Sequence, residues 1–345
     1  MSFTILCLLS IPLMIEYRMS AKAELVTLYV DDSNKGGPWY GTKEDPYQNI
    51  TSALEHAIDG DTIFVRAGTY YENVVVNKSI SLVGEDRDLT IVDGNEAGTV
   101  ISIEADKVSI KGFTVQGSGL ELPDSGISVY QSSGSDISNN IVTSNYNGIR
   151  FGYHSSGNVI SSNTITSNFN GISLSYYSCS NVVSGNTITK NNEGISFYYY
   201  SSSNVVSGNN ITNNDDGISL FFSCDNVVSG NTITSNNEGI YLAFNSNNNT
   251  IYCNNFNNTH QVAGDSTNVW DDGRKGNYWS NYTGQDLNED GIGDNPYVID
   301  VNNQDNHPLM GMFSVFNVTS ERETHHVTTI CNSTISDFRF EIGPE

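Results

Sequence analysis

Three carboxylates recur at the same position of a repeated sequence motif, directly before a glycine. That position is occupied in turn by Asn147, Asn170, Glu193, Asp216 and Glu238, at intervals of 22 or 23 residues. If each repeat is one coil of a stack, neighbouring residues lie about 4.8 Å apart and the carboxylates form a line. Carboxylates at so short a distance raise one another's pKa or recruit a cation. They can also act as the acid pair of glycoside hydrolysis. The alternative, a solvated corner where Asn, Asp and Glu are interchangeable, is favoured because no second acidic cluster converges on the line.

Aromatic residues recur five positions after the glycine. The column holds Tyr153, Tyr176, Tyr199, Phe222 and Phe244, and Tyr198 and Tyr200 flank it. Buried stacking would make the column structural, whereas exposed rings with hydroxyl rims would form a platform for sugar rings. The structural interpretation is favoured, although both can hold together. Because Tyr198, Tyr199 and Tyr200 are consecutive, at least one phenol is expected to face solvent. The candidate glycan-binding residues are Tyr153, Tyr176, Tyr199 and Tyr200.

A third motif follows the pattern of a calcium-binding loop. Oxygen-bearing side chains occupy loop positions 1, 3, 5 and 9, glycine occupies position 6, and a backbone carbonyl would serve position 7. Position 12 departs from the pattern, since Tyr297 replaces the bidentate Glu; Asp300, further along, is a possible substitute. The sequence predicts a structural Ca²⁺ that pins the C-terminal end of the fold, with ligands Asp286, Asn288, Asp290, Ile292 and Asp294.

These motifs lie in or beside a chain of short repeats. Their aligned glycines are Gly126, Gly148, Gly171, Gly194, Gly217 and Gly239, spaced by 22 or 23 residues. A fixed period in this range indicates a solenoid, and short alternating segments bounded by Asn and Gly indicate strands and turns. Two apolar columns predict the core wall: Ile149, Ile172, Ile195, Ile218 and Ile240, and then Phe151, Leu174, Phe197, Leu220 and Leu242. The predicted fold is an all-β, right-handed parallel β-helix with 22–23 residues per coil.

Three further columns consist of asparagine. They are Asn158, Asn181, Asn204, Asn226 and Asn249; Asn140, Asn163, Asn186, Asn209, Asn231 and Asn254; and Asn145, Asn168, Asn191, Asn214 and Asn236. Asparagine tolerates the left-handed backbone conformation, so these residues are placed at the corners of the coil. Stacked coils would let each amide bond the next, as in an asparagine ladder.

The N-terminal part has two predicted features. Residues 5–15 form an apolar run followed by Ala21-Lys22-Ala23, which is typical of a secretory signal, although the basic region that normally precedes such a run is missing. Asp45-Pro46 is the predicted start of a helix that ends at Asp59-Gly60 and caps the first coil, with Ile50, Ala53, Leu54, Ala57 and Ile58 on one side. Eight N-glycosylation sequons are compatible with export: Asn49, Asn77, Asn210, Asn248, Asn257, Asn281, Asn317 and Asn332.

The segment GDTIFVRAGTYYENVVVNKSISLVG followed by NxITxNxxGI coils resembles the right-handed β-helices of the NosD-type and carbohydrate-binding, sugar-hydrolase families. The segment VWDDGRKGNYWSNYTGQDLNEDGIGDNPYVID resembles the block that closes NosD-type helices of archaeal surface proteins. The resemblance covers residues 28–312 and implies the fold more than the function, because such coils host lyases, hydrolases, adhesins and accessory proteins. Together with the features described above, it predicts five segments: a signal (1–23), a cap helix and irregular coils (24–125), regular coils (126–256), a closing block (257–312) and the start of a truncated appended β domain or tail (313–345).

Charge and composition exclude several functions. The formal net charge is −24, so nucleic acid and anionic membrane surfaces are not expected partners, and no membrane span is expected after signal removal. Arg150 and Lys190 are the only bases in residues 126–256 and lie in different columns, which argues against a lyase that acts on acidic polysaccharides. The six histidines form no cluster that would favour copper. Cys179 and Cys224 share a column two coils apart, about 9.6 Å, so no disulfide is expected.

The sequence therefore predicts a secreted, cell-surface or periplasmic β-helix without catalytic activity, which binds a polysaccharide or envelope glycan or packs as a structural module into an envelope layer. One alternative is a polysaccharide hydrolase, less readily a lyase, that uses Glu193, Asp216 or Glu238. The other is an accessory protein in copper-enzyme maturation, which rests on the family resemblance alone.

Overall fold

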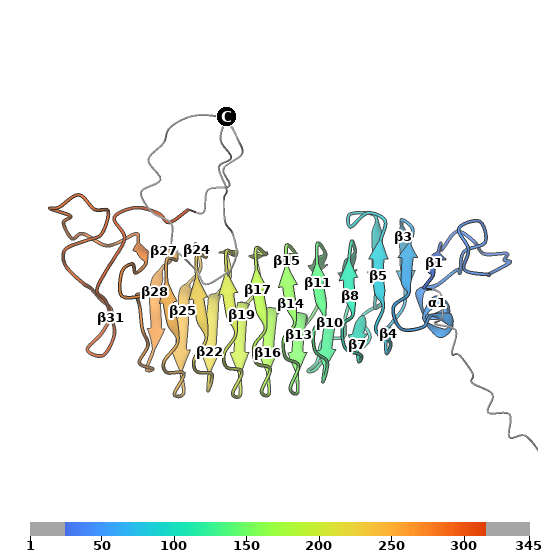
Figure 1. The fold of residues 1–345 in the computed structure, drawn as a ribbon, viewed down its shortest axis with the longest axis horizontal. Coiled ribbons are helices and arrows are strands. Elements are labelled where there is room, and N and C mark those ends of the chain that lie inside the picture. The colour runs from blue at the N-terminus through green and yellow to red at the C-terminus, as the bar shows by residue number, and fades with distance from the viewer. Residues whose placement is uncertain (1–24, 315–345) are drawn as a thin grey trace, which may run out of the picture.

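The computed structural model describes residues 25–314 and shows one long parallel β-helix (Figure 1). Each coil contributes a strand to each of three parallel sheets, and the strands stack in register along the axis. The predicted all-β solenoid is confirmed. The signal assigned to residues 1–23 and most of the tail, residues 315–345, lie outside the described residues.

Two of the sheets consist of strands of two to four residues. Sheet 1 contains β1 (Thr27–Val30), β2 (Thr62–Val65), β5 (Ser81–Gly84), β8 (Ser109–Lys111), β11 (Asp136–Ser138), β14 (Val159–Ser161), β17 (Val182–Ser184), β20 (Val205–Ser207), β23 (Val227–Ser229) and β26 (Thr250–Tyr252). Sheet 2 contains β3 (Gly68–Tyr71), β6 (Thr90–Asp93), β9 (Thr114–Gln116), β12 (Ile141–Thr143), β15 (Thr164–Thr166), β18 (Thr187–Thr189), β21 (Asn210–Thr212), β24 (Thr232–Thr234), β27 (Asn255–Asn257) and β29 (Tyr278–Trp279).

Sheet 3 has the longest strands and carries the repeated glycine phrase. It contains β4 (Val74–Val76), β7 (Ile101–Ile103), β10 (Ser125–Tyr130), β13 (Asn147–Gly152), β16 (Asn170–Ser175), β19 (Glu193–Tyr198), β22 (Asp216–Phe221), β25 (Glu238–Ala243) and β28 (His260–Gly264). Both predicted apolar columns face inward from this sheet and are at most 1% exposed. The repeated motif requires glycine because the backbones of adjacent coils approach each other closely there. A Cβ on Gly148 would lie 2.5 Å from the carbonyl oxygen of Gly171 on the next coil.

The asparagine columns form three buried ladders that run the length of the regular coils. At Asn186, the side-chain oxygen accepts hydrogen bonds from the backbone N–H of Asn163 (2.9 Å) and from its side-chain amide (3.1 Å). The amide of Asn186 then donates to the carbonyls of Ile160 (3.0 Å) and Ser184 (3.1 Å). Each ladder residue therefore joins two coils and satisfies backbone groups that the corner removes from the sheets.

The left-handed conformation predicted for these asparagines is found one residue earlier. Ser162 (φ 57°), Lys190 (φ 58°) and Asn213 (φ 57°) precede ladder residues and adopt it, whereas the ladder asparagines do not. The prediction was wrong on this point because a ladder side chain must point inward along the axis. The residue before it makes the bend, and its side chain faces outward.

The single α-helix of the described residues, α1 (Ile50–His56), covers the first coil (Figure 1). Its predicted start at Asp45-Pro46 was wrong, because Asn49 is the N-cap and accepts a hydrogen bond from the backbone N–H of Ser52 (2.8 Å). The segment before it continues the sheet instead: Tyr47 bridges Val30 in parallel. Ile50, Ala53 and Leu54 form the buried face of this helix, which therefore acts as the predicted cap.

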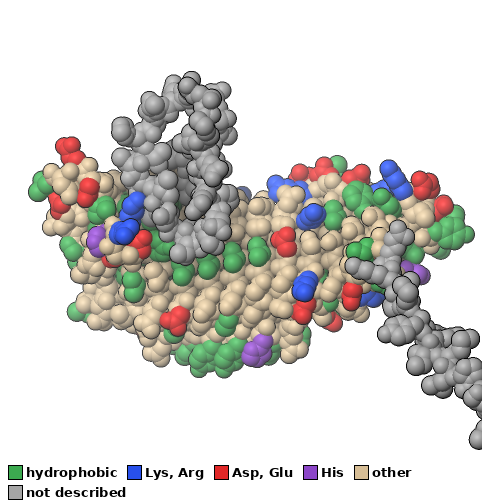
Figure 2. All heavy atoms as spheres, viewed as in Figure 1, with side chains coloured by type: hydrophobic (Ala, Val, Ile, Leu, Met, Phe, Trp, Pro, Cys, Tyr) green, Lys and Arg blue, Asp and Glu red, His purple; other side chains and the backbone are tan. Residues whose placement is uncertain are grey.

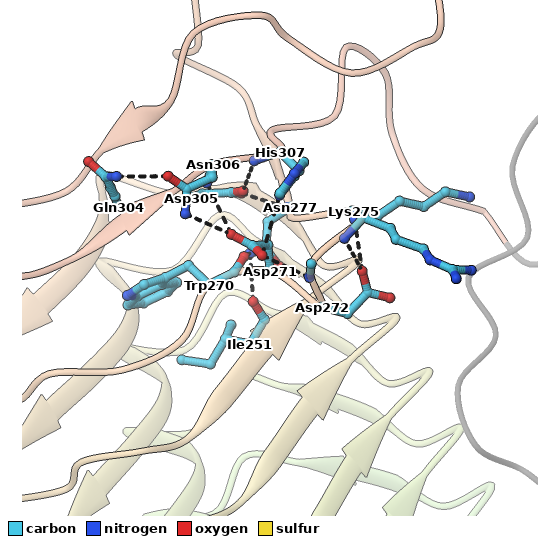
Figure 3. A network of polar contacts seen from close by, with 12 residues as sticks. Ile251, Trp270, Asp271, Asp272, Lys275, Asn277, Gln304, Asp305, Asn306 and His307 are labelled. Atoms are coloured by element: carbon cyan, nitrogen blue, oxygen red, sulfur yellow. Dashed lines mark hydrogen bonds and ion pairs between the residues drawn. The ribbon is translucent and has the colours of Figure 1, made fainter.

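The C-terminal block closes the other end of the helix, beyond β28 (Figure 1), and includes the antiparallel pair β30 (Tyr297–Val298) and β31 (Gln304–Asp305). One asparagine ladder ends here on a carboxylate: Asp305 accepts from the backbone N–H of Asn277 (2.7 Å; Figure 3). It also accepts from the indole N–H of Trp279 (2.8 Å). Asp271 accepts from the backbone N–H of Asn306 (3.1 Å) in the same network. The block thus supplies acceptors for the last coil, as a cap must.

We predict that Asn186→Ala lowers the free energy of unfolding by about 3–5 kcal/mol, because two buried donors on Asn163 lose their acceptor. Asn237→Ala is the matched control: Asn237 is exposed, lies two coils further on, and its side chain makes no hydrogen bond among the described residues, so the variant should change the free energy of unfolding by less than about 0.5 kcal/mol. Urea unfolding followed by circular dichroism measures both. Equal losses in the two variants would contradict a structural role for the ladder.

Candidate functional site

The carboxylate line predicted from the repeat exists on sheet 3. Parallel pairing aligns Asn147 with Asn170, Asn170 with Glu193, Glu193 with Asp216, Asp216 with Glu238, and Glu238 with His260. All six residues therefore share one position at the start of their strands. The line begins with two amides, which bond each other, and ends beside an imidazole.

Glu193 is held by a neighbour on its own strand. The hydroxyl of Tyr198 lies 2.7 Å from each carboxylate oxygen of Glu193 and donates its proton to this pair. Burial, together with the charge of Glu193, raises the pKa of Tyr198. The phenol therefore stays protonated and fixes the direction of the carboxylate.

Asp216 is the carboxyl group of the line whose titration is perturbed. Burial raises its pKa to about 6, the hydroxyl of Ser219 (3.1 Å) works against the rise, and the charges of Glu193 and Glu238 add to it. Glu238 lies 3.0 Å from Nδ1 of His260. Three adjacent acids thus have three different partners: the phenol of Tyr198, the hydroxyl of Ser219 and the imidazole of His260.

The aromatic column lies in the corner that follows sheet 3 and is largely exposed. Tyr153 and Tyr176 stack with ring centroids 4.8 Å apart and 4° between planes, and Tyr176 and Tyr199 stack at 5.0 Å and 16°. The exposed fraction is 42% for Tyr153, 46% for Tyr199 and 54% for Tyr200. The expectation that one of the three consecutive tyrosines faces solvent is confirmed, and the column is a surface strip rather than core. In Figure 2, hydrophobic side chains gather along the lower edge of the molecule, below β16 and β22.

These tyrosines hold an uncommon backbone conformation. Tyr153 (φ 49°), Tyr176 (φ 54°), Tyr199 (φ 49°) and Tyr200 (φ 66°) are all left-handed. Bulky residues adopt this region at a cost of about 1–3 kcal/mol, and the other corners use Ser, Asn, Asp or Gly at most such positions. The corner therefore retains aromatic side chains where smaller residues would fold more easily.

A groove of about 840 Å³ runs across the outer face of sheet 3 beside this strip. Glu193, Tyr153, Tyr176 and Tyr199 line it, so four of the seven predicted catalytic and glycan-binding residues meet there. Asp216, Glu238 and Tyr200 are not among its lining residues. The line of acids therefore enters the groove only at Glu193.

Part of the groove wall was not predicted from the sequence. Tyr146 and Phe169 stack at 5.1 Å on the opposite side, Tyr130 packs on Tyr153 at 5.4 Å, and Arg150 lies on the groove floor. Tyr146 and Phe169 precede the amides of the carboxylate line by one residue, 23 positions apart. That spacing was a usable signal, since it places two aromatic rings on adjacent coils.

The predicted calcium loop has carboxylates that bond its own backbone. Asp286 accepts from the backbone N–H of Gly291 (2.8 Å), Asp290 from that of Ile292 (2.9 Å), and Asp294 from that of Leu287 (2.7 Å). In residues 25–314, no three His, Cys, Asp or Glu side chains are grouped so that they would hold a metal. The ligand set Asp286, Asn288, Asp290, Ile292 and Asp294 stays a prediction.

The histidines of residues 25–314 do not fit a copper centre. His56 bonds the carbonyl of Ser52 (2.8 Å), His154 stacks on Tyr177, and His260 and His307 each face a carboxylate. His325 and His326 lie outside the described residues. Cys179 and Cys224 are free, so the predicted absence of a disulfide between them is confirmed.

The comparisons with known proteins agree with this architecture. The model of the family described as "Periplasmic copper-binding protein (NosD)" matches residues 54–284. No curated protein sequence matches the chain. None of the helices in the described range is long and apolar enough to cross a membrane.

Three solved structures share the fold at low identity. An alginate lyase from Paenibacillus sp. str. FPU-7 is 15% identical with a TM-score of 0.51, and the match covers 74% of this chain and 98% of that one. The pectate lyase Pel9A is 16% identical with a TM-score of 0.52, over 72% and 80%. XylC, solved with xylose, is 12% identical with a TM-score of 0.54, over 73% and 68%. The chain thus has a pectin-lyase-like parallel β-helix fold.

The raised pKa of Asp216 has a consequence for stability. A carboxyl whose pKa is higher in the folded than in the unfolded protein binds more protons when folded, so stability falls as pH rises from about 4 to about 6. After allowance for solvent screening, we predict a loss of about 1–2 kcal/mol over this range that Asp216→Asn removes. Urea unfolding of both proteins at several pH values measures it. Identical pH profiles would contradict the burial of this charge.

The calcium loop is tested by thermal unfolding. We predict that about 1 mM Ca²⁺ raises the melting temperature and that equal Mg²⁺ does so less, because Ca²⁺ accepts the irregular oxygen set of such loops. Asp286→Asn combined with Asp290→Asn should abolish the Ca²⁺ effect, whereas Asp136→Asn, an exposed acid on β11, should preserve it. An unchanged melting temperature in Ca²⁺ would refute the predicted ion.

Proposed function

The chain belongs to the NosD family, and from this premise we propose that it is a parallel β-helix protein of the cell surface or periplasm that binds a glycan without cleaving it. The observation that carries the proposal is the groove lined by Tyr153, Tyr176 and Tyr199. Sugar rings present apolar faces and hydroxyl edges, which suit aromatic faces with phenolic rims.

The spacing of the strip supports this proposal. Stacked rings at 4.8 and 5.0 Å, on coils locked in register, form a continuous surface with little side-chain freedom left to lose on binding. The opposite wall carries a second stack, Tyr146 on Phe169. An extended saccharide that lay along the groove would therefore meet aromatic side chains on both sides.

The acids of the groove support a role in binding rather than cleavage. Glycoside hydrolysis uses two carboxyl groups on either side of the scissile bond. Among the described residues, Glu193 and Glu104 are the two acids that line the groove. Both oxygens of Glu193 accept from the Tyr198 hydroxyl, and Glu104 accepts from the Ser102 hydroxyl (3.2 Å), so each carboxyl already has a protein partner. Asp216 and Glu238 are not among the lining residues.

Hydrolysis is the second candidate, favoured by one observation. Asp216, whose pKa is raised to about 6, lies on the coil next to Glu193, and such a carboxyl could donate a proton near neutral pH. A role in copper-enzyme maturation has the family description in its favour, but the described histidines do not fit a copper site.

The binding proposal predicts that Tyr153→Ala and Tyr176→Ala each weaken glycan binding by about fivefold to tenfold, because each removes one ring of the strip. A glycan array of bacterial, algal and plant oligosaccharides selects the probe, and calorimetric titration measures its affinity. Tyr71→Ala removes a more exposed tyrosine on β3 that does not line the groove, and this variant should bind as the wild type does.

The same samples distinguish binding from cleavage. Release of reducing ends by the wild type, lost in a Glu193→Gln and Asp216→Asn double variant, would replace the proposal with hydrolysis. Binding that survives Tyr153→Ala and Tyr176→Ala unchanged, or no glycan binding at all, would overturn it.

A further inference from the structure

Arg150 breaks the pattern of its column. Pairing in sheet 3 aligns it with Ser128 on the preceding coil and Ser173 on the next, and the column continues with Ser196 and Ser219. From β7 to β25, this outward position holds serine on five strands, with Ser102 before Ser128, and Tyr241 on β25; only β13 has a cation there. The scaffold does not need arginine there, because serine or tyrosine serves the other coils.

Within residues 25–314, the guanidinium of Arg150 has no hydrogen-bond or ion-pair partner. The residue is only 8% exposed, yet it makes no side-chain hydrogen bond or ion pair with any residue of 25–314. Burial lowers the pKa of Arg150, but a guanidinium remains protonated throughout the physiological range. A buried cation without a counter-ion is costly to retain, and buried charges in proteins are normally paired.

The surroundings of Arg150 are shaped to keep its guanidinium in the groove. A Cβ on Gly152 would lie 2.9 Å from Nη1 of Arg150, so the absence of a side chain there makes room for the guanidinium. Tyr130, Tyr153 and Tyr176 are close enough to raise the pKa of Arg150 against the effect of burial, and all three line the groove. The serine hydroxyls on either side, Ser128 and Ser173, also line the groove and have no hydrogen-bond partner in residues 25–314.

We infer that Arg150, with Ser128 and Ser173, forms a carboxylate-binding subsite, and that the glycan held in this groove contains uronic acid residues. The planar guanidinium offers parallel N–H donors that match the two oxygens of a carboxylate, and the flanking hydroxyls can bond the same sugar. The stacked tyrosines beside the subsite would hold the ring that carries the carboxylate. This inference rests on the proposed glycan binding and specifies its substrate class.

The negative charge of the chain does not oppose this subsite at physiological salt. The formal net charge is −24, but screening limits repulsion between exposed charges to about 8 Å at 0.15 M salt. The carboxylates that line the groove, Glu104 and Glu193, form no ion pair with Arg150. The guanidinium is therefore available to a carboxylate of the ligand.

A matched pair of ligands tests the inference. Oligogalacturonate and its methyl ester have the same sugar rings, but only the acid carries carboxylates. We predict that the wild type binds the acid about tenfold more tightly than the ester in calorimetric titration at about 0.15 M salt. Arg150→Gln should remove this preference, so that it binds the acid and the ester with equal affinity. Gly152→Ala, which displaces the guanidinium without removing it, should reduce the preference.

Two controls separate the local effect from net charge and from folding. Lys190→Gln removes the other base of the regular coils, which is exposed and outside the groove, and should keep the full preference. Arg150→Gln should melt no earlier than the wild type without ligand, because it removes an unpaired buried charge. If Arg150→Gln unfolds, Gly152→Ala provides the test: a reduced preference for the acid over the ester supports the subsite, and an unchanged preference contradicts it.

The outcomes distinguish this inference from the proposed function. Equal binding of acid and ester by the wild type, or a preference that persists in Arg150→Gln, overturns the carboxylate subsite and leaves glycan binding intact. Binding of neither ligand while a neutral glycan binds at the tyrosines also overturns it. Absence of all glycan binding overturns the proposed function itself.

Discussion

The structure depends on the hydrogen bonds of its asparagine ladders. A β-helix bends the chain three times in every coil, and each bend takes backbone donors and acceptors out of the sheets and into the interior. Burying such groups without partners costs about 1–3 kcal/mol each. One amide per corner resolves this, because its oxygen accepts from the coil before it while its nitrogen donates to carbonyls of its own and the preceding coil. A single residue type repeated in register thus satisfies the corners.

The ladders also decide what the surface can display. They and the sheet pairing fix successive coils in register, so any side chain that recurs on the outside becomes a strip with a constant spacing of about 4.8 Å. The aromatic column in the corner after sheet 3 depends on this regularity: Tyr153 and Tyr176 stack because their coils are in register. Departures from the repeat then stand out as local chemistry. Arg150 within a serine column, and the change from amide to acid between Asn170 and Glu193, are two such departures on one face.

Much of the fold was predictable from the sequence because its determinants are periodic. The two apolar columns, the ladders and the stacked acids all follow from a spacing of 22–23 residues. What failed was local geometry. The cap helix begins at Asn49 and not at Asp45-Pro46, because pairing of Tyr47 with Val30 overrides the start signal. The left-handed residue precedes each ladder asparagine, since the inward amide leaves that residue to make the bend.

The groove was the least predictable part of the site. Its tyrosines and Glu193 were identified as separate columns, but their meeting depends on how the corner after sheet 3 bends, and no periodicity reports that. In the sequence, Arg150 is a single base in a column different from that of Lys190, which indicates only that lyase chemistry is disfavoured. Its burial without a partner, beside Gly152, appears only in three dimensions.

The central claim is that this face of the helix holds an acidic saccharide along its coils. A crystal structure of the protein with bound oligogalacturonate tests it most directly. We predict sugar rings over Tyr153 and Tyr176 and a ring carboxylate within hydrogen-bond distance of the Arg150 guanidinium. A saccharide bound on another face, or one in the groove whose carboxylates all point away from Arg150, would contradict the account.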